Sequence, residues 1–130
     1  MTLINRFLII VSLVIMLPSW SGGEEGHWMA PAKEAGRKNP VPADKASIER
    51  GKKLYKTHCA VSHGEKGRGD GPAGAGLTPK PADLAMMAMH HADGDLAWKI
   101  ATGRGAMPGW KSTLTEDQIW DLVNFIKKGI

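Results

Sequence analysis

The sequence predicts a small all-α protein, and three features of the chain lead to that prediction. Three segments place apolar side chains at helical spacing between residues typical of helix ends. No segment alternates apolar and polar residues as a half-buried strand does. The stretches between these segments are rich in glycine and proline, which is typical of loops. At 130 residues, the chain has room for one domain.

Residues 1–22 have the order of a secretory signal peptide. One positive charge within Met1–Arg6 precedes a strongly apolar run, Phe7–Leu17, and small residues follow. The run is too short to span a bilayer as a helix. We therefore predict cleavage near Ser21–Gly23 and export to the periplasm. Contact with a membrane is expected only if this segment stays uncleaved.

Residues 23–46 are polar and contain Pro31, Pro40 and Pro42, which predicts an extended arm rather than a helix. The large apolar side chains of this arm are Trp28 and Met29, so we expect them to fix it to the domain formed by residues 47–130.

The first predicted helix covers residues 48–59, with Ser47 as its N-cap and Glu49 in its first turn. Gly51 lowers the stability of this helix, so we expect it to let another helix approach closely. One face carries residues at helical spacing: Ile48, Gly51, Leu54, Tyr55 and His58.

Two further helices are predicted in the second half of the chain. Residues 94–103 form one, capped by Asp93 and ended by Gly103. Thr115 and Gln118 form a capping box that begins the last helix. Its apolar face and flanking aromatic residues are Ile119, Leu122, Val123, Ile126, Trp120 and Phe125.

The segment Gly64–Gly76 contains six glycines and is predicted to be a loop. Its stretch GDGPAG matches a dinucleotide-binding pattern, but no strand is predicted before it, so we reject that function. Prolines at 72, 79 and 81 predict that the following segment is irregular. The helices carry too few apolar side chains for a large core, which favours a bound prosthetic group.

Charge and cysteine content limit the function further. The formal net charge of +4 falls to +3 without Arg6, and this mildly basic surface suits an acidic partner protein. No basic block interleaved with aromatic residues indicates nucleic-acid binding. Cys59 is the only cysteine, so an exported chain cannot form an internal disulfide with it.

The stretch HCAVSHGEKG, residues 58–67, contains most of a covalent haem-attachment motif. On a helix, the spacing of Cys59 and His63 puts both side chains on one face, where a haem vinyl can add to the sulfur while the imidazole binds iron. Ser62 stands where the motif has a second cysteine, and its hydroxyl cannot form a second thioether. The alternative is an ordinary surface cysteine near an unrelated histidine.

Met107 is the candidate for a second iron ligand. It lies in a predicted loop, not on an apolar stripe, and Pro108 and Gly109 beside it can fix the orientation of its thioether. A methionine ligand raises the reduction potential of haem relative to two histidines.

Five stretches in order make the sequence resemble the small class I c-type cytochromes of bacterial periplasms. They are SIERGKKLYKTHCAVSHG, GRGDGPAG, LTPKPADL, DGDLAWKIATGRGAMPGW and LTEDQIWDLVNFI, within residues 28–130. The resemblance implies a fold of three to five short helices with long loops around one haem c. It also implies electron transfer with partner proteins, without enzymatic activity.

The resemblance assigns roles to individual residues. Cys59 is similar to the first thioether cysteine, Ser62 takes the position of the second, and His63 and Met107 are similar to the proximal and distal iron ligands. Gly51 and Tyr55 resemble the residues that cross the final helix near Leu122 and Phe125. A carbonyl within residues 79–82, with Pro81 favoured, is expected to accept the imidazole proton.

Several alternatives stay open. The stretch MMAMHH, residues 86–91, can bind copper, although methionines that cover the haem pocket and surface histidines are the favoured interpretation. His58 is interpreted as a helix-face residue, and His27 has no predicted partner. A gas-binding or gas-sensing haem protein, a Cys59–His63 enzyme and a haem-free interaction subunit are the competing functions.

Overall fold

The computed structural model describes residues 27–130, so the predicted signal peptide and the start of the arm lie outside the described residues. This part of the chain has no strand, which confirms the all-α prediction, although the helices outnumber those expected. The elements are α1 Ala32–Ala35, α2 Lys45–His58, α3 Ala60–His63, the 3₁₀ turn η1 Pro72–Gly74, α4 Leu84–His90, α5 Asp93–Thr102 and α6 Glu116–Lys128.

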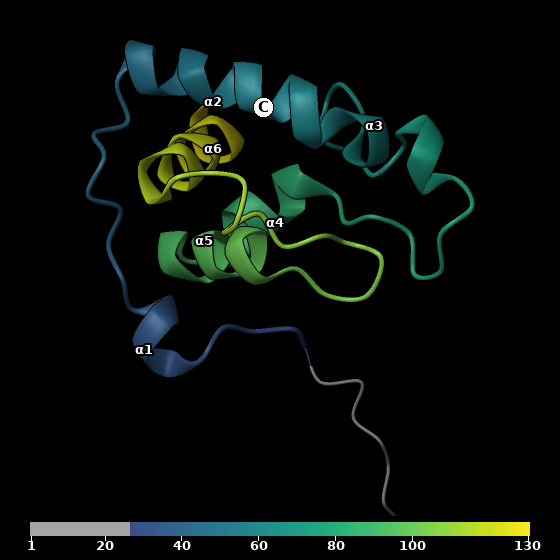
Figure 1. Cartoon of the computed structure of the whole chain (residues 1–130), viewed down its shortest axis with the longest axis horizontal. Helices are drawn as coiled ribbons and strands as arrows, with labels where there is room; N and C mark the ends of the chain where they lie inside the picture. The colour runs from purple at the N-terminus through teal and green to yellow at the C-terminus, as the bar shows by residue number, and fades with distance from the viewer. Residues whose placement is uncertain (1–26) are drawn as a thin grey trace, which may run out of the picture.

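The crossing of α2 and α6 organises the fold (Figure 1). Gly51 lies where the two helices meet, and a Cβ atom added there would overlap the backbone carbonyl of Asp121. One turn further along α2, the rings of Tyr55 and Phe125 are 5.2 Å apart. The prediction that Gly51 and Tyr55 cross the final helix is confirmed.

The hydrophobic core lies between α6 and the helices α2 and α5. The capping box at the start of α6 is present as predicted, because Thr115 accepts from Gln118 N–H and Gln118 accepts from Thr115 N–H. Burying the apolar face of α6 is the main favourable term for so small a domain. The buried core residues are Tyr55, Leu96, Ala97, Ile100, Leu114, Ile119, Trp120, Leu122, Val123, Phe125 and Ile126.

Two predicted helix caps are wrong. Asp44, not Ser47, caps α2 and accepts a hydrogen bond from Ser47 N–H at 2.8 Å. The Ser47 hydroxyl is buried and donates to Asp121 Oδ1 on α6 at 2.6 Å, so it joins two helices instead. At α5 the capping residue is Ala92, and Asp93 is the first helical residue.

Two short helices were not expected. The arm contains α1, and the Glu34 carbonyl there approaches α5 closely because Gly94 has no side chain. The segment predicted to be irregular after Pro81 contains α4, because the Asp83 side chain accepts from Met86 N–H and begins a helix. The approach of α1 to Gly94 is a long-range contact that the local sequence does not show, whereas the Asp83 cap is a local signal that the nearby prolines obscured.

The arm is attached to α5 by a buried charge cluster. The Ala30 N–H donates to Asp95 Oδ1 at 2.6 Å, and Asp95 Oδ2 lies 2.6 Å from Lys99 Nζ and 2.7 Å from His91 Nδ1. Burial alone would raise the pKa of Asp95, but the Ala30 N–H and the Lys99 ammonium outweigh it and lower that pKa. Of the two residues predicted to fix the arm, Trp28 packs against Trp98 of α5, and Met29 is 50% exposed.

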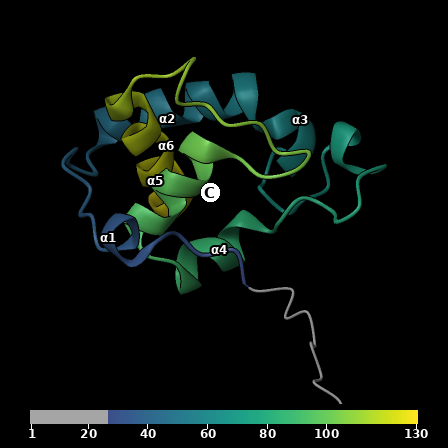
Figure 2. The same cartoon turned by 60° about the horizontal axis from the view of Figure 1, so that its bottom comes forward.

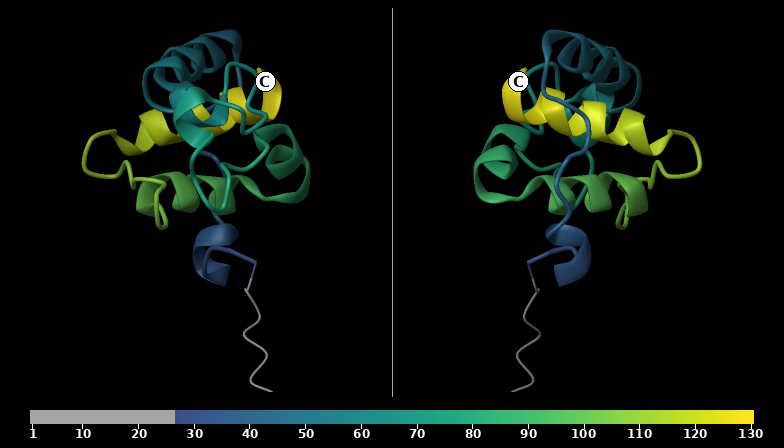
Figure 3. Two further views of the ribbon diagram at one scale, coloured as in Figure 1. Left: turned by 90° about the vertical axis from the view of Figure 1, so that its right-hand side faces the viewer. Right: turned by 90° about the vertical axis from the view of Figure 1, so that its left-hand side faces the viewer.

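The connection from α1 to α2 passes over α6 (Figure 3). Asn124 of α6 holds it, because its side-chain amide donates to the Val41 carbonyl at 3.0 Å and accepts from Asn39 Nδ2 at 2.8 Å.

None of the described helices is long and apolar enough to cross a bilayer.

We expect Gly51→Ala to destabilise the domain by about 1–3 kcal/mol, because the new methyl group forces α2 and α6 apart. Gly76→Ala is the matched control, since a Cβ there meets no atom within 4 Å. Urea unfolding of both variants measures the difference. Equal unfolding midpoints would show that the helices do not need the close approach.

We expect Asp95→Asn to cost about 3–5 kcal/mol of stability, because it leaves the Lys99 ammonium buried without its counter-charge. The control is Asp93→Asn, which removes a more exposed ion pair with Lys127 and should cost about 1 kcal/mol or less. Thermal unfolding monitored by circular dichroism compares the two. Similar losses would contradict the buried-pair interpretation.

Candidate haem-binding site

Three of the four predicted site residues line one cavity of about 490 Å³. Ser62 and His63 of α3 lie on it, and Met107 reaches it from the loop after α5, which extends to the α3 side of the molecule in Figure 2. The remaining walls come from residues 77–82, 104–108 and the arm residues His27 and Trp28. Cys59 is not among the lining residues.

His63 has one ring nitrogen free for a metal. Its Nδ1 lies 3.1 Å from the Ala82 carbonyl oxygen. A carbonyl can only accept, so Nδ1 carries the proton and Nε2 keeps its lone pair. Burial lowers the pKa of His63, while the hydrogen bond to Ala82 acts in the opposite direction. The ring is therefore favoured in the neutral form that binds metals.

The prediction that the Pro81 carbonyl accepts the proton of the His63 imidazole is wrong by one residue. The acceptor, Ala82, lies within the predicted range 79–82. The Pro81 carbonyl instead faces Gly69, which has φ +75° and no side chain to block the approach.

Cys59 joins α2 to α3 and shares a helical turn with the other motif residues. Its carbonyl accepts from Ser62 N–H at 3.1 Å and from His63 N–H at 2.9 Å. The side chain is half-buried and packs against the hydrophobic core, and burial raises the pKa of the thiol to about 11. Such a thiol is neutral at physiological pH, which disfavours the Cys59–His63 enzyme because a nucleophilic cysteine needs a depressed pKa.

The glycine-rich loop packs its backbone directly on α3. Gly69 N–H donates to the His63 carbonyl at 2.8 Å, and Gly71 N–H donates to the Ser62 carbonyl at 3.1 Å. A Cβ atom at Gly71 would overlap the α3 backbone. Tyr55 completes the frame, since its hydroxyl donates to the Gly64 carbonyl at 2.6 Å. The glycines therefore support α3, and residues 27–63 contain no strand before them such as a dinucleotide site requires.

Met107 lies half-buried in a loop whose ends are held by the backbone. Arg104 and Met107 exchange two backbone hydrogen bonds of 2.9 and 3.0 Å. At the base, Trp110 N–H donates to the Ile100 carbonyl at 3.0 Å. Gly103 has φ +64°, a conformation that favours glycine, where the chain leaves α5.

The interpretation of MMAMHH is correct for His90, which is exposed, and wrong for other residues of the stretch. Its methionines line neither cavity; Met86 and Met89 are 51% and 69% exposed. His91 is not a surface residue, because its Nδ1 contacts Asp95 and Lys99. Residues 27–130 contain no group of three or more His, Cys, Asp or Glu side chains that could hold a metal ion.

Sequence reasoning missed the contribution of the arm to the cavity. His27 and Trp28 line it, together with Arg104, although all three are distant from the attachment motif. The single hint was the large indole of Trp28 within a polar arm. His58 is a helix-face residue as expected, with its ring centroid 4.7 Å from that of Trp110.

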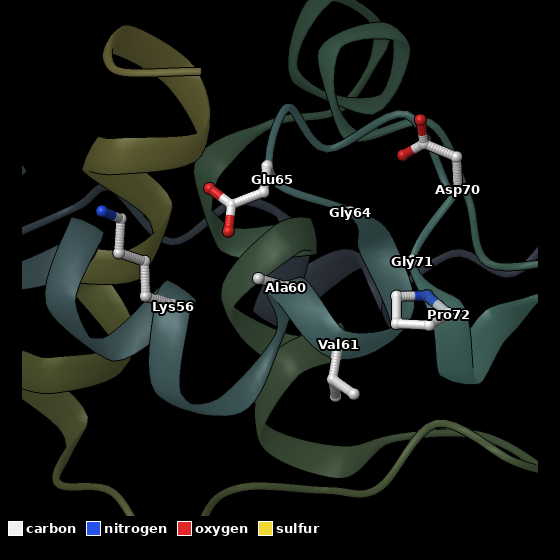
Figure 4. Close-up of a pocket in the computed structure, with 8 residues that line it drawn as sticks. All are labelled: Lys56, Ala60, Val61, Gly64, Glu65, Asp70, Gly71 and Pro72. Atoms are coloured by element: carbon white, nitrogen blue, oxygen red, sulfur yellow. The ribbon is translucent and has the colours of Figure 1, made fainter.

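A second cavity of about 480 Å³ lies against α3 (Figure 4). Ala60, Val61 and Gly64 line it with charged residues such as Lys56 and Glu65. It shares no lining residue with the first cavity and contains neither histidine nor methionine. It therefore offers haem iron no axial ligand.

The first cavity suits haem in size and chemistry. Its volume falls in the range of about 300–1,000 Å³ that is usual for cofactor sites. Leucine, proline and alanine side chains make up much of its wall, which suits an apolar macrocycle. A neutral imidazole and a thioether are both common axial donors to haem iron.

Comparisons with known proteins give the family. Residues 46–126 match the family model described as "Cytochrome C oxidase, cbb3-type, subunit III". Cytochrome c6 of Nostoc sp. (strain PCC 7120 / SAG 25.82 / UTEX 2576) is 32% identical over 85 residues, which are 65% of this chain and 73% of that protein.

A solved structure is similar too. It is a chain of the Kuenenia stuttgartiensis reducing HAO-like protein complex Kustc0457/Kustc0458, with a TM-score of 0.59 and 27% identity. The match covers 74% of the present chain and 48% of that chain, so the present chain spans about half the length of the solved one. The family model covers more than half of the sequence, and the helical fold agrees with it: this chain belongs to the cytochrome c family, whose members carry covalently bound haem c and transfer electrons.

Proposed function

We propose that this chain is a periplasmic electron carrier whose haem iron is held between His63 and Met107 and whose haem is attached by one thioether, through Cys59. The observation that carries the proposal is that an imidazole and a thioether from distant segments line one largely apolar cavity. Haem, when bound, supplies a one-electron change at iron.

The residues of this chain have distinct tasks in that function. The Ala82 carbonyl orients the His63 ring and makes its free nitrogen a better donor. As a ligand, Met107 would raise the reduction potential of the haem iron relative to a second histidine. The apolar walls limit water, which also affects the reduction potential. Electron transfer needs no proton donor or base, so we propose no enzymatic step.

Localisation and partners are part of the proposal. The apolar segment at residues 7–17 favours export, and c-type cytochromes act outside the cytoplasm. Lys80 and Arg104 line the cavity and are exposed, so cationic groups stand where a redox partner would approach. We therefore propose a partner protein with an acidic docking face.

We expect one covalently attached haem with one unreacted vinyl group, because Ser62 lines the cavity where a second cysteine is missing. Intact mass under denaturing conditions and the pyridine haemochrome spectrum test this. Ser62→Cys should shift that spectrum to the two-thioether position, whereas Ser112→Cys, at an exposed site away from the cavity, should not. A two-thioether spectrum from the unchanged chain would contradict the proposal.

We expect Met107→Ala to open the sixth iron position and to raise the rate of carbon monoxide binding to the reduced protein at least about tenfold. His63→Ala should abolish the low-spin spectrum. Met89→Ala, on an exposed side chain outside the cavity, is the control and should change neither. Rapid carbon monoxide binding by the unchanged chain at neutral pH would favour the gas-binding alternative.

A further inference from the structure

Trp28 is the residue at which the arm meets the loop that carries Met107. We infer that Trp28 is a positioning residue: through Arg104 it keeps Met107 at the cavity as the distal ligand. This inference rests on the proposed His63/Met107 ligation and adds to it a residue far from the attachment motif.

The indole of Trp28 is fixed from the side of α5. Its ring centroid lies 6.2 Å from that of Trp98, in an edge-to-face arrangement with an interplanar angle of 60°. The Lys99 ammonium lies 5.7 Å from the same ring. Two residues along the arm, Ala30 N–H is bonded to the buried Asp95. Trp28 is therefore held by a rigid helix and not only by the arm.

On its other side, Trp28 contacts the loop through Arg104. The Arg104 guanidinium lies 5.6 Å from the centroid of the indole ring, which is within cation–π distance. The Arg104 backbone exchanges two hydrogen bonds with Met107. Arg104 thus connects Trp28 to Met107. Its side chain contacts the indole, and its main chain is hydrogen-bonded to Met107.

The other restraints on this loop come from its backbone. Gly103 packs against the Met107 carbonyl and Pro108, and Gly109 packs against the Thr102 carbonyl at the end of α5. At its tip, Gly105 has no neighbour within 4 Å of an added Cβ, and Ala106 and Pro108 are exposed. The Trp28–Arg104 contact therefore adds a side-chain restraint to the outer part of a loop that is otherwise held by its backbone.

The experiment uses the haem-loaded full chain. Trp28→Ala should raise the rate of carbon monoxide binding to the reduced protein about tenfold, which corresponds to about 1.4 kcal/mol. It should also weaken the absorption band of the methionine–iron(III) bond and lower the reduction potential. Met29→Ala is the matched control, because Met29 is the next residue, is half exposed and does not line the cavity.

Arg104→Gln provides a second test that leaves the arm intact. If Trp28 acts through Arg104, this variant should reproduce most of the increase in the rate of carbon monoxide binding. The double variant should then bind carbon monoxide little faster than either single variant. Rates in Trp28→Ala and Arg104→Gln no faster than in Met29→Ala would overturn the positioning role. Fully additive effects of the two substitutions would overturn the route through Arg104.

Failure of the proposed ligation has a different signature. The unchanged chain would then bind carbon monoxide as fast as Met107→Ala and lack the methionine–iron(III) band, which would overturn both proposals together. A slow unchanged chain with an equally slow Trp28→Ala variant overturns the positioning role alone.

Discussion

The close crossing of α2 and α6 is the constraint on which the rest of the structure depends. Gly51 permits it, and Tyr55 uses it: the Tyr55 ring packs against Phe125, and its hydroxyl binds the carbonyl of Gly64 at the end of α3. The same residue therefore joins the core to the turn that carries Ser62 and His63. A change in the angle between the two helices would therefore move the side of the cavity that carries His63.

The two sides of the cavity are built differently. The His63 side comes from one continuous stretch, in which the glycine loop bonds to the backbone of α3 and the Ala82 carbonyl accepts from the His63 ring. The Met107 side is assembled from the Met107 loop and the arm, which meet through the Trp28 and Arg104 side chains. Backbone hydrogen bonds can form with many different side chains, whereas the Trp28–Arg104 contact is lost when either side chain is replaced.

The sequence predicted the features that local rules determine. The capping box at Thr115 and the need for Gly51 follow from spacing and residue type, and both are present. Several errors concern long-range partners: Ser47 has the chemistry of a cap, but its hydroxyl donates to Asp121 of another helix. Likewise, no local pattern could show that Ala82, and not Pro81, faces His63, and the size of the Trp28 indole was only a hint that this arm residue belongs to the site.

The buried Asp95 also bears on where this protein can be cut. The family match begins at residue 46, but Asp95 takes one of its hydrogen bonds from Ala30, and Trp28 forms part of the cavity wall. A shortened version that starts at the family boundary would leave a carboxylate short of a donor and a cavity open on one side. The contacts that complete the fold and the cavity of this cytochrome therefore extend upstream of the residues that the family model matches, as far as Trp28.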